Sequence, residues 1–144
     1  FCKIVLMKLS LYILIISLLI ASCNSKDDYI EEVYVNIDVD LNLPLYSDLQ
    51  VSGNSMFIEG GVEGIIIYHG VGNDYEVYDR NCSYEPSLAC SVIDSVNSGI
   101  AYCGCCASAF LLAQDGAAAN SPALLPLKAY YFTLSENNQM RISN

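Results

Sequence analysis

Three cysteines fall within four positions of one short stretch, YCGCCASAF at residues 102–110: Cys103, Cys105 and Cys106. So dense a group indicates a metal site, a disulfide or a redox-active thiol. The 144-residue chain contains seven cysteines and one histidine, His69. Thiols pair outside the cytoplasm and stay reduced inside it, so the compartment decides among these chemistries.

The N-terminal segment predicts export. From Met7 the chain reads MKLSLYILIISLLIASC, with one lysine, an apolar run and small residues before Cys23. The apolar run of about 12 residues is shorter than the ~20 needed to span a bilayer, so we expect a cleaved leader over residues 1–22. The residues before Met7 are expected to lie upstream of the translation start.

The sequence I-A-S-C at the end of that leader resembles a bacterial lipobox. The resemblance implies that the Cys23 thiol is lipidated and becomes the mature N-terminus. Residues 23–32 then form an acidic tether, and the chain is expected to be an outer-membrane lipoprotein, periplasmic or on the cell surface. The alternative is an ordinary secretory signal cut nearby, which leaves Cys23 free.

The charge balance disfavours nucleic acid as a partner. The chain has 16 acidic and 6 basic residues, a net charge of −10. Removal of residues 1–22 takes Lys3 and Lys8 with it, which leaves four basic residues and a net charge of −12. Such a surface repels phosphate backbones. The expected partner is the membrane, through the N-terminal lipid, and the sequence identifies no protein or glycan partner.

The presence of a single histidine argues against an enzyme active site. Nucleophilic triads and Cys-His pairs need an imidazole beside the nucleophile. His69 lies in YHGVGN at the predicted end of a strand, where a solvated turn histidine is the simpler interpretation. We therefore expect no catalytic residues.

Short apolar segments separated by turn residues predict an all-β fold. Residues 33–43, VYVNIDVDLNL, alternate apolar and polar side chains until Pro44. Segments spaced by roughly ten residues follow, each bounded by Gly, Asn, Asp or Ser: SMFIEG, GIIIYHG, YEVYD, CSVID, GIAYC, SAFLLAQ, LKAYYFTL and QMRISN. The sequence predicts one small antiparallel β-domain over residues 33–144.

Five cysteines remain for this domain once Cys2 and Cys23 are assigned to the leader and the lipid: Cys82, Cys90, Cys103, Cys105 and Cys106. Because five is odd, two bridges at most can form within one chain and one thiol is left over. Four of these cysteines alone allow three connectivities, so the residue count leaves the pairing open.

The order of motifs from Asp79 to Tyr130 resembles the Rieske iron–sulfur domain. DRNCSYEPSLAC is followed by a strand pair and then by CGCCASAFLLAQDGAAANSPALLPLKAY. The resemblance places Cys82 and Cys103 at the two ligand cysteines, and it implies a small antiparallel fold of stacked sheets with two cysteine-bearing loops. Its two ligand histidines, however, are replaced by Tyr84 and Cys106. A Rieske centre needs both imidazoles, so we do not expect one.

One interpretation of the site keeps a metal. Cys82, Cys103 and Cys106 would hold a 2Fe–2S cluster or a zinc ion, since Cys-x-x-Cys spacing suits both. The fourth ligand would come from one of three residues: Cys90, Cys105 or Tyr84.

A second interpretation replaces the cluster with disulfides. The Rieske resemblance implies a bridge between Cys90 and Cys105, and Cys82 could pair with Cys103 or Cys106 across the former cluster site. Each bridge would contribute roughly 2 to 4 kcal/mol. Adjacent Cys105 and Cys106 are not expected to pair with each other.

A third interpretation makes the unpaired cysteine an exchange-active thiol, for which Arg80 is the only cation nearby in sequence. We favour the second interpretation: a non-catalytic envelope or surface module without a cofactor. The alternative function is an electron-transfer protein with a cysteine-ligated 2Fe–2S or zinc centre.

Overall fold

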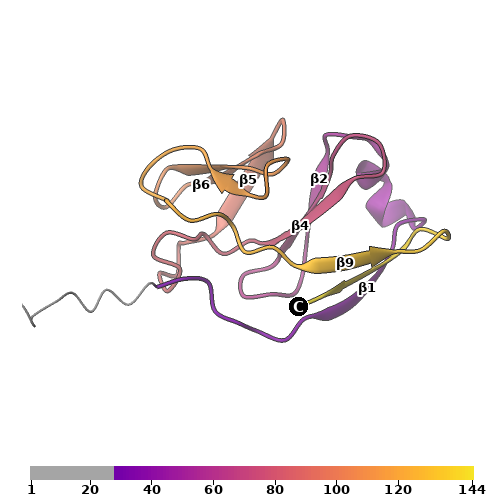
Figure 1. Ribbon diagram of the computed structural model, residues 1–144, viewed down its shortest axis with the longest axis horizontal. Coiled ribbons are helices and arrows are strands. Elements are labelled where there is room, and N and C mark those ends of the chain that lie inside the picture. The colour runs from indigo at the N-terminus through magenta and orange to yellow at the C-terminus, as the bar shows by residue number, and fades with distance from the viewer. Residues whose placement is uncertain (1–27) are drawn as a thin grey trace, which may run out of the picture.

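The computed structural model describes residues 28–144, and within that range the chain forms three small antiparallel sheets (Figure 1). The strand orders are β1-β10-β9, β2-β3-β4 and β5-β6-β7-β8. The bounds of the elements are β1 Asn36–Asp40, a 3₁₀ helix Pro44–Gln50, β2 Ser55–Ile58, β3 Ile65–His69, β4 Tyr75–Asp79, β5 Ile93–Asn97, β6 Ile100–Cys103, β7 Ser108–Leu111, β8 Ala117–Ala118, β9 Tyr131–Leu134 and β10 Gln139–Ser143. The predicted leader and Cys23 lie outside the described residues.

The prediction of a small all-β fold is confirmed, and the strands fall on the apolar segments. Two details differ. The alternating pattern of residues 33–43 yields a strand only over Asn36–Asp40, because the chain turns at residues 41–43 and enters the 3₁₀ helix at Pro44. The segment CSVID begins its strand only at Ile93, since Ser91 and Val92 still belong to the preceding loop.

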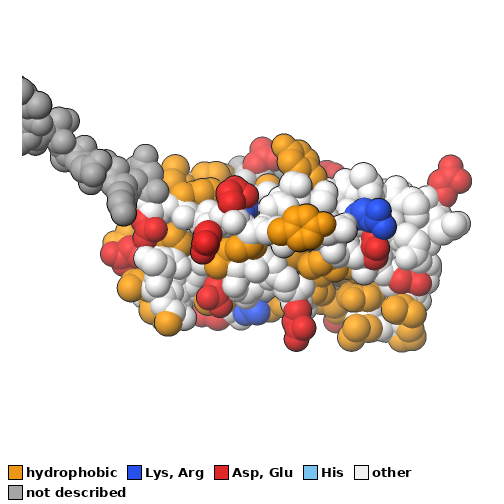
Figure 2. All heavy atoms as spheres, turned by 90° about the horizontal axis from the view of Figure 1, so that it is seen from below, with side chains coloured by type: hydrophobic (Ala, Val, Ile, Leu, Met, Phe, Trp, Pro, Cys, Tyr) orange, Lys and Arg blue, Asp and Glu red, His pale blue; other side chains and the backbone are white. Residues whose placement is uncertain are grey.

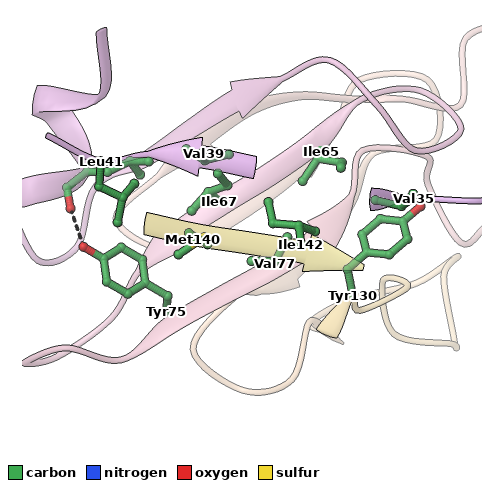
Figure 3. Packing of buried hydrophobic residues seen from close by; sticks show 11 residues of the cluster. Val35, Val39, Leu41, Ile65, Ile67, Tyr75, Val77, Tyr130, Met140 and Ile142 are labelled. Atoms are coloured by element: carbon green, nitrogen blue, oxygen red, sulfur yellow. Dashed lines mark hydrogen bonds between the residues drawn. The ribbon is translucent and has the colours of Figure 1, made fainter. Parts of the chain in front are cut away.

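Strand β3 is buried on both faces and joins two hydrophobic cores. Side chains along a strand alternate between its faces. Ile65 and Ile67 therefore pack with β1, β4 and β10, where their side chains meet Val39, Val77 and Met140 (Figure 3). Ile66 points the other way, into the core beneath the sheet β5-β6-β7-β8.

The second core lies under the cysteine-bearing loops. Phe110, Ile93 and Ala101 come from β5 to β7, and Tyr78 reaches them from β4. The Tyr78 hydroxyl donates a hydrogen bond of 2.7 Å to the backbone oxygen of Leu112, which ties the middle sheet to the cysteine-bearing sheet. Two of the cysteines, Cys82 and Cys103, belong to this core.

Residues 28–32, the end of the segment interpreted as a tether, lie against the domain. Ile30 is only 3% exposed. The Lys128 ammonium donates to the backbone oxygen of Glu31 at 2.7 Å and pairs with the Glu32 carboxylate at 3.0 Å. An apolar side chain within a polar run thus anchors the segment before β1, which runs along the lower edge in Figure 1.

His69 is buried rather than solvated, so that interpretation of the sequence was wrong. Its side chain is 6% exposed and stacks on Tyr75 with ring centroids 4.4 Å apart. Its Nε2 atom lies 2.6 Å from the backbone oxygen of Gly72. The histidine packs the β3–β4 turn, where aromatic stacking offsets the cost of burying a polar ring.

Acidic side chains outnumber basic ones on the surface. Figure 2 shows carboxylate side chains scattered over one whole face, with few basic ones between them. Within residues 28–144 there is no helix of the length and apolarity that crossing a membrane requires.

Candidate thiol and metal site

The first cysteine-bearing loop connects β4 to β5 and folds back on itself. The backbone N–H of Cys82 donates to the backbone oxygen of Ser91 at 2.8 Å. The hydroxyl of Ser91 donates to the backbone oxygen of Tyr84 at 2.6 Å. These bonds close the loop and place the Cys82 side chain on its inner side, fully buried.

The second loop is the tight turn between β6 and β7. Cys103 pairs with Ser108 at the end of the β6–β7 ladder, which leaves four residues to reverse the chain. Gly104 donates its N–H to the Asp94 carboxylate at 2.8 Å, and Ala107 adopts a left-handed conformation with φ 58°. The turn brings Cys106 back to the same side as Cys103.

A disulfide joins the two loops. It connects Cys90 to Cys105, with Cα atoms 5.5 Å apart and a sequence separation of 15 residues. This is the pairing that the Rieske resemblance implied. It also removes both cysteines from the set of possible fourth ligands, as long as it stays oxidised.

The three other cysteines of the described chain converge as free thiols. Their Sγ atoms all lie within 4.8 Å of one another, and those of Cys82 and Cys106 are 3.5 Å apart. A disulfide bond measures about 2.05 Å, so these two sulfurs are in contact but not bonded. The expected second bridge, from Cys82 to Cys103 or Cys106, is not formed in this structure.

The three thiols differ in acidity. Burial raises the pKa of Cys82 to about 12 and also raises the pKa of Cys103. Burial acts on Cys106 in the same direction, but hydrogen bonds from the hydroxyl and backbone N–H of Ser108, together with those from Cys103 and Cys82, outweigh it and lower the pKa. Cys106 is therefore the first of the three to ionise.

Ser108 is a site residue that the sequence analysis missed. Its buried hydroxyl lies 3.1 Å from Cys106 Sγ and accepts a hydrogen bond of 3.1 Å from the backbone N–H of Ala123. That second bond fixes the hydroxyl beside the thiol. A serine two residues after a cysteine cluster was the available signal, although it is a weak one.

Two other residues were named in the sequence analysis of this site, Tyr84 and Arg80. Tyr84 is partly buried and packs against the second core, to which Cys82 and Cys103 also belong. The Arg80 guanidinium lies 4.1 Å from the centroid of the Phe57 ring and donates to the backbone oxygen of Ile93. Because Arg80 is engaged there, the exchange-active-thiol interpretation loses the cation on which it depended.

A Rieske two-iron cluster does not fit this set of donors. It needs two imidazoles, and His69 packs on Tyr75 in the β3–β4 hairpin instead. A cluster with four cysteine ligands needs one more thiolate than the converging group of the described chain supplies. The Cys90–Cys105 disulfide would have to open before either of its sulfurs could serve.

Comparison with solved structures identifies the type of fold. No protein-family model and no curated protein matches the sequence. Among solved structures, a chain of the complex of reduced oxygenase and oxidized ferredoxin in carbazole 1,9a-dioxygenase superposes with a TM-score of 0.50. The match has 14% sequence identity and covers 78% of this chain and 94% of that one. The chain has a Rieske-type fold.

Other ferredoxins superpose on the same Rieske-type domain. The ferredoxin of carbazole 1,9a-dioxygenase from Nocardioides aromaticivorans IC177 has 16% identity and a TM-score of 0.47, covering 77% of this chain and 97% of that one. The Sphingomonas yanoikuyae B1 ferredoxin has 19% identity and a TM-score of 0.47, covering 65% and 88%. The predicted fold class is confirmed by the three antiparallel sheets and by the match with a TM-score of 0.50, at a sequence identity that shows the fold alone.

Proposed function

We propose that this chain is a non-catalytic, lipid-anchored module of the bacterial envelope, in which a Rieske-type fold has exchanged its two-iron cluster for a disulfide-tied pair of loops. The observation that carries the proposal is the set of donors at the loop tips. The Cys90–Cys105 bridge is formed, and the Sγ atom of Cys106, the residue at which the Rieske resemblance implies a ligand histidine, lies 3.5 Å from that of Cys82.

Export and anchoring rest on the sequence before the domain. The apolar leader and the I-A-S-C sequence ending at Cys23 support lipidation. A disulfide between two loops also suits a compartment outside the cytoplasm. The domain follows the proposed anchor closely, because Ile30 is already buried against it. The proposed location is the outer membrane, with the domain in the periplasm or on the cell surface.

Analysis of the native centre tests the loss of the cluster. The chain is expressed with its own leader in a bacterium that has an outer membrane, and it is purified without oxygen. We expect less than 0.1 iron and 0.1 acid-labile sulfide per chain, and no paramagnetic signal after reduction. Two irons and two sulfides per chain would overturn the proposal.

Fractionation with a matched variant tests the anchor. Wild-type protein is expected in the membrane fraction and to incorporate labelled fatty acid. The Cys23→Ala variant is expected to lose the label. Equal labelling of both proteins would refute lipidation at Cys23.

A second candidate is an electron-transfer protein with a cysteine-ligated centre, and the convergence of three Sγ atoms within 4.8 Å favours it. A two-iron centre of this kind would require the Cys90–Cys105 bridge to open and supply the fourth thiolate. Visible absorption that disappears in Cys103→Ala would support this candidate. A colourless wild-type protein prepared without oxygen would eliminate it.

A further inference from the structure

The three converging thiols are not explained by the function proposed above. Cys82 and Cys103 are 0% and 1% exposed, and neither takes part in the disulfide that ties the loops together. A scaffold module needs only packing at these positions, which alanine or valine would provide. Three sulfurs arranged around one point indicate a shared ligand instead.

We propose that Cys82, Cys103 and Cys106 form a three-thiolate site for one thiophilic d¹⁰ metal ion, Zn²⁺ or Cu(I). The proposal is independent of the lipid anchor. It differs from a two-iron centre in needing neither imidazole nor inorganic sulfide.

The spacing of the sulfurs fits a single ion. A metal–sulfur bond of about 2.3 Å sets sulfur–sulfur distances of about 3.8 Å in a tetrahedral site and about 4.0 Å in a trigonal plane. The Sγ atoms of Cys82 and Cys106 are 3.5 Å apart, and all three Sγ atoms lie within 4.8 Å of one another. Side-chain torsion changes that move the sulfurs by at most about 1 Å are enough to close the site.

The donors select soft ions. The converging group within the described chain contains sulfur alone, with no carboxylate or imidazole, and thiolates prefer Cu(I), Zn²⁺ and iron–sulfur centres over hard cations. Iron–sulfur centres of the Rieske or four-cysteine type lack ligands here. Zinc and Cu(I) remain because both tolerate three protein ligands.

The surroundings allow either ion. Cys106 is half-buried, so one side of the site is accessible to a water molecule that could complete a zinc tetrahedron. Cu(I) needs no fourth ligand. Three thiolates leave a net charge of −1 around Zn²⁺ and −2 around Cu(I), so charge favours zinc while donor count favours Cu(I). The Ser108 hydroxyl, 3.1 Å from Cys106 Sγ, can donate to the metal-bound thiolate in both cases.

Binding involves no electron transfer. As each metal–sulfur bond forms, the corresponding S–H bond breaks and its proton passes to solvent. Oxidation of Cys82 and Cys106 to a disulfide would remove two electrons and two protons and eliminate the site. The metal-binding form is therefore the one with three reduced thiols.

Metal titration of the full chain tests the site. Protein is purified without oxygen, stripped of metal and titrated separately with Zn²⁺ and Cu(I) against coloured chelators. We expect one ion per chain, with retention of the Cys90–Cys105 bridge confirmed by mass mapping. X-ray absorption distinguishes the ions: three sulfurs and one oxygen around zinc, or three sulfurs around Cu(I).

Two variants identify the ligands. Cys106→Ser replaces the least buried thiol and is expected to weaken metal binding about 100-fold or more. Mutation of residues that only support metal ligands already lowers metal affinity by up to about 100-fold. The matched control, Cys90→Ala with Cys105→Ala, removes the other two cysteines of the domain and should bind with wild-type affinity. Near-ultraviolet circular dichroism shows that each variant is folded.

Several results would overturn the inference. Absence of binding by reduced wild-type protein would do so, as would equal binding by Cys106→Ser or loss of binding in the control pair. A Cys82–Cys106 disulfide in natively isolated protein would also refute it. None of these results bears on the proposed envelope role. That role is refuted if the protein contains two irons and two sulfides per chain, or if Cys23 carries no lipid.

Discussion

The Cys90–Cys105 disulfide offers the sharpest quantitative prediction. Its sequence separation is 15 residues, and the loop-entropy relation assigns such a closure about 3 kcal/mol. Removing both cysteines, as Cys90→Ala with Cys105→Ala, should therefore lower the free energy of unfolding by about 3 kcal/mol. Against a typical domain stability of about 5 to 15 kcal/mol, the variant should still fold.

The decrease in the free energy of unfolding should arise mainly from the unfolded chain. In the folded protein each loop has its own hydrogen bonds, such as Cys82 N–H to Ser91 and Gly104 N–H to Asp94. The native loops should therefore keep their shape without the bridge, while the unfolded ensemble gains freedom.

Urea unfolding measures the loss. The chain has eleven tyrosines and no tryptophan, so tyrosine fluorescence and far-ultraviolet circular dichroism are the probes. Wild-type and variant proteins are compared with and without reductant. Reduced wild type should match the variant, and the variant itself should not respond to reductant.

Two outcomes would refute this reasoning. A loss below about 0.5 kcal/mol would mean that the bridge is absent or that the unfolded chain is already compact there. A variant that still responds to reductant would contain another disulfide, and Cys82 paired with Cys103 or Cys106 is then the one to map.

Three further predictions concern the core. Asp79→Asn should cost about 3 kcal/mol in urea unfolding, because one oxygen of the buried carboxylate accepts bonds from the N–H of Val62 and the hydroxyl of Tyr130, both at 2.6 Å, and the other accepts from the N–H of Asn81 at 2.7 Å, so that the amide NH₂ would face a donor in either orientation. Burial, and then Asp79, raise the pKa of Tyr130, so its phenol stays neutral in the folded state while the unfolded phenol ionises. Stability should fall as the pH rises above about 10, the unfolded value, and the fall should be smaller in Tyr130→Phe. Gly116→Ala should lower the melting temperature, at a cost of about 2 kcal/mol, because φ is +65° and the new Cβ would lie 2.9 Å from Tyr78 Cε1; an unchanged melting temperature would contradict this.

The strands were predictable because their signals are local. Alternation, apolar runs and turn residues each act within a few positions, so nearly every apolar segment became a strand. The 3₁₀ helix at Pro44–Gln50 was missed because one turn has no period to detect.

Burial of polar groups could not be predicted from the same signals. Asp79 is 0% exposed and accepts a bond from Tyr130, 51 residues away, and no local pattern indicates either fact. His69 was expected in solvent and is buried beside Tyr75. Such environments depend on long-range contacts, about which composition and spacing say nothing.

The candidate site was likewise predictable only in part. Which cysteines matter followed from the order of motifs, and the Cys90–Cys105 pairing followed from the Rieske resemblance. Whether the remaining three cysteines are free thiols or form a disulfide could not be predicted in this way. Cys82 and Cys106 are 24 residues apart, and whether their sulfurs bond or only touch depends on the shape of both loops.

The convergence of the thiols does not require a cluster to organise it. Cys82 and Cys103 are part of the second core, whose largest side chains, Tyr78 and Phe110, are fully buried. The Ser83 hydroxyl also ties the first loop to the backbone oxygen of Leu125 at 2.6 Å. Packing, hydrogen bonds and a disulfide therefore position the loops without imidazole ligands. A fold in which the loops are set before the metal can change its metal without changing its shape, and that is the physical basis for expecting a different ion here.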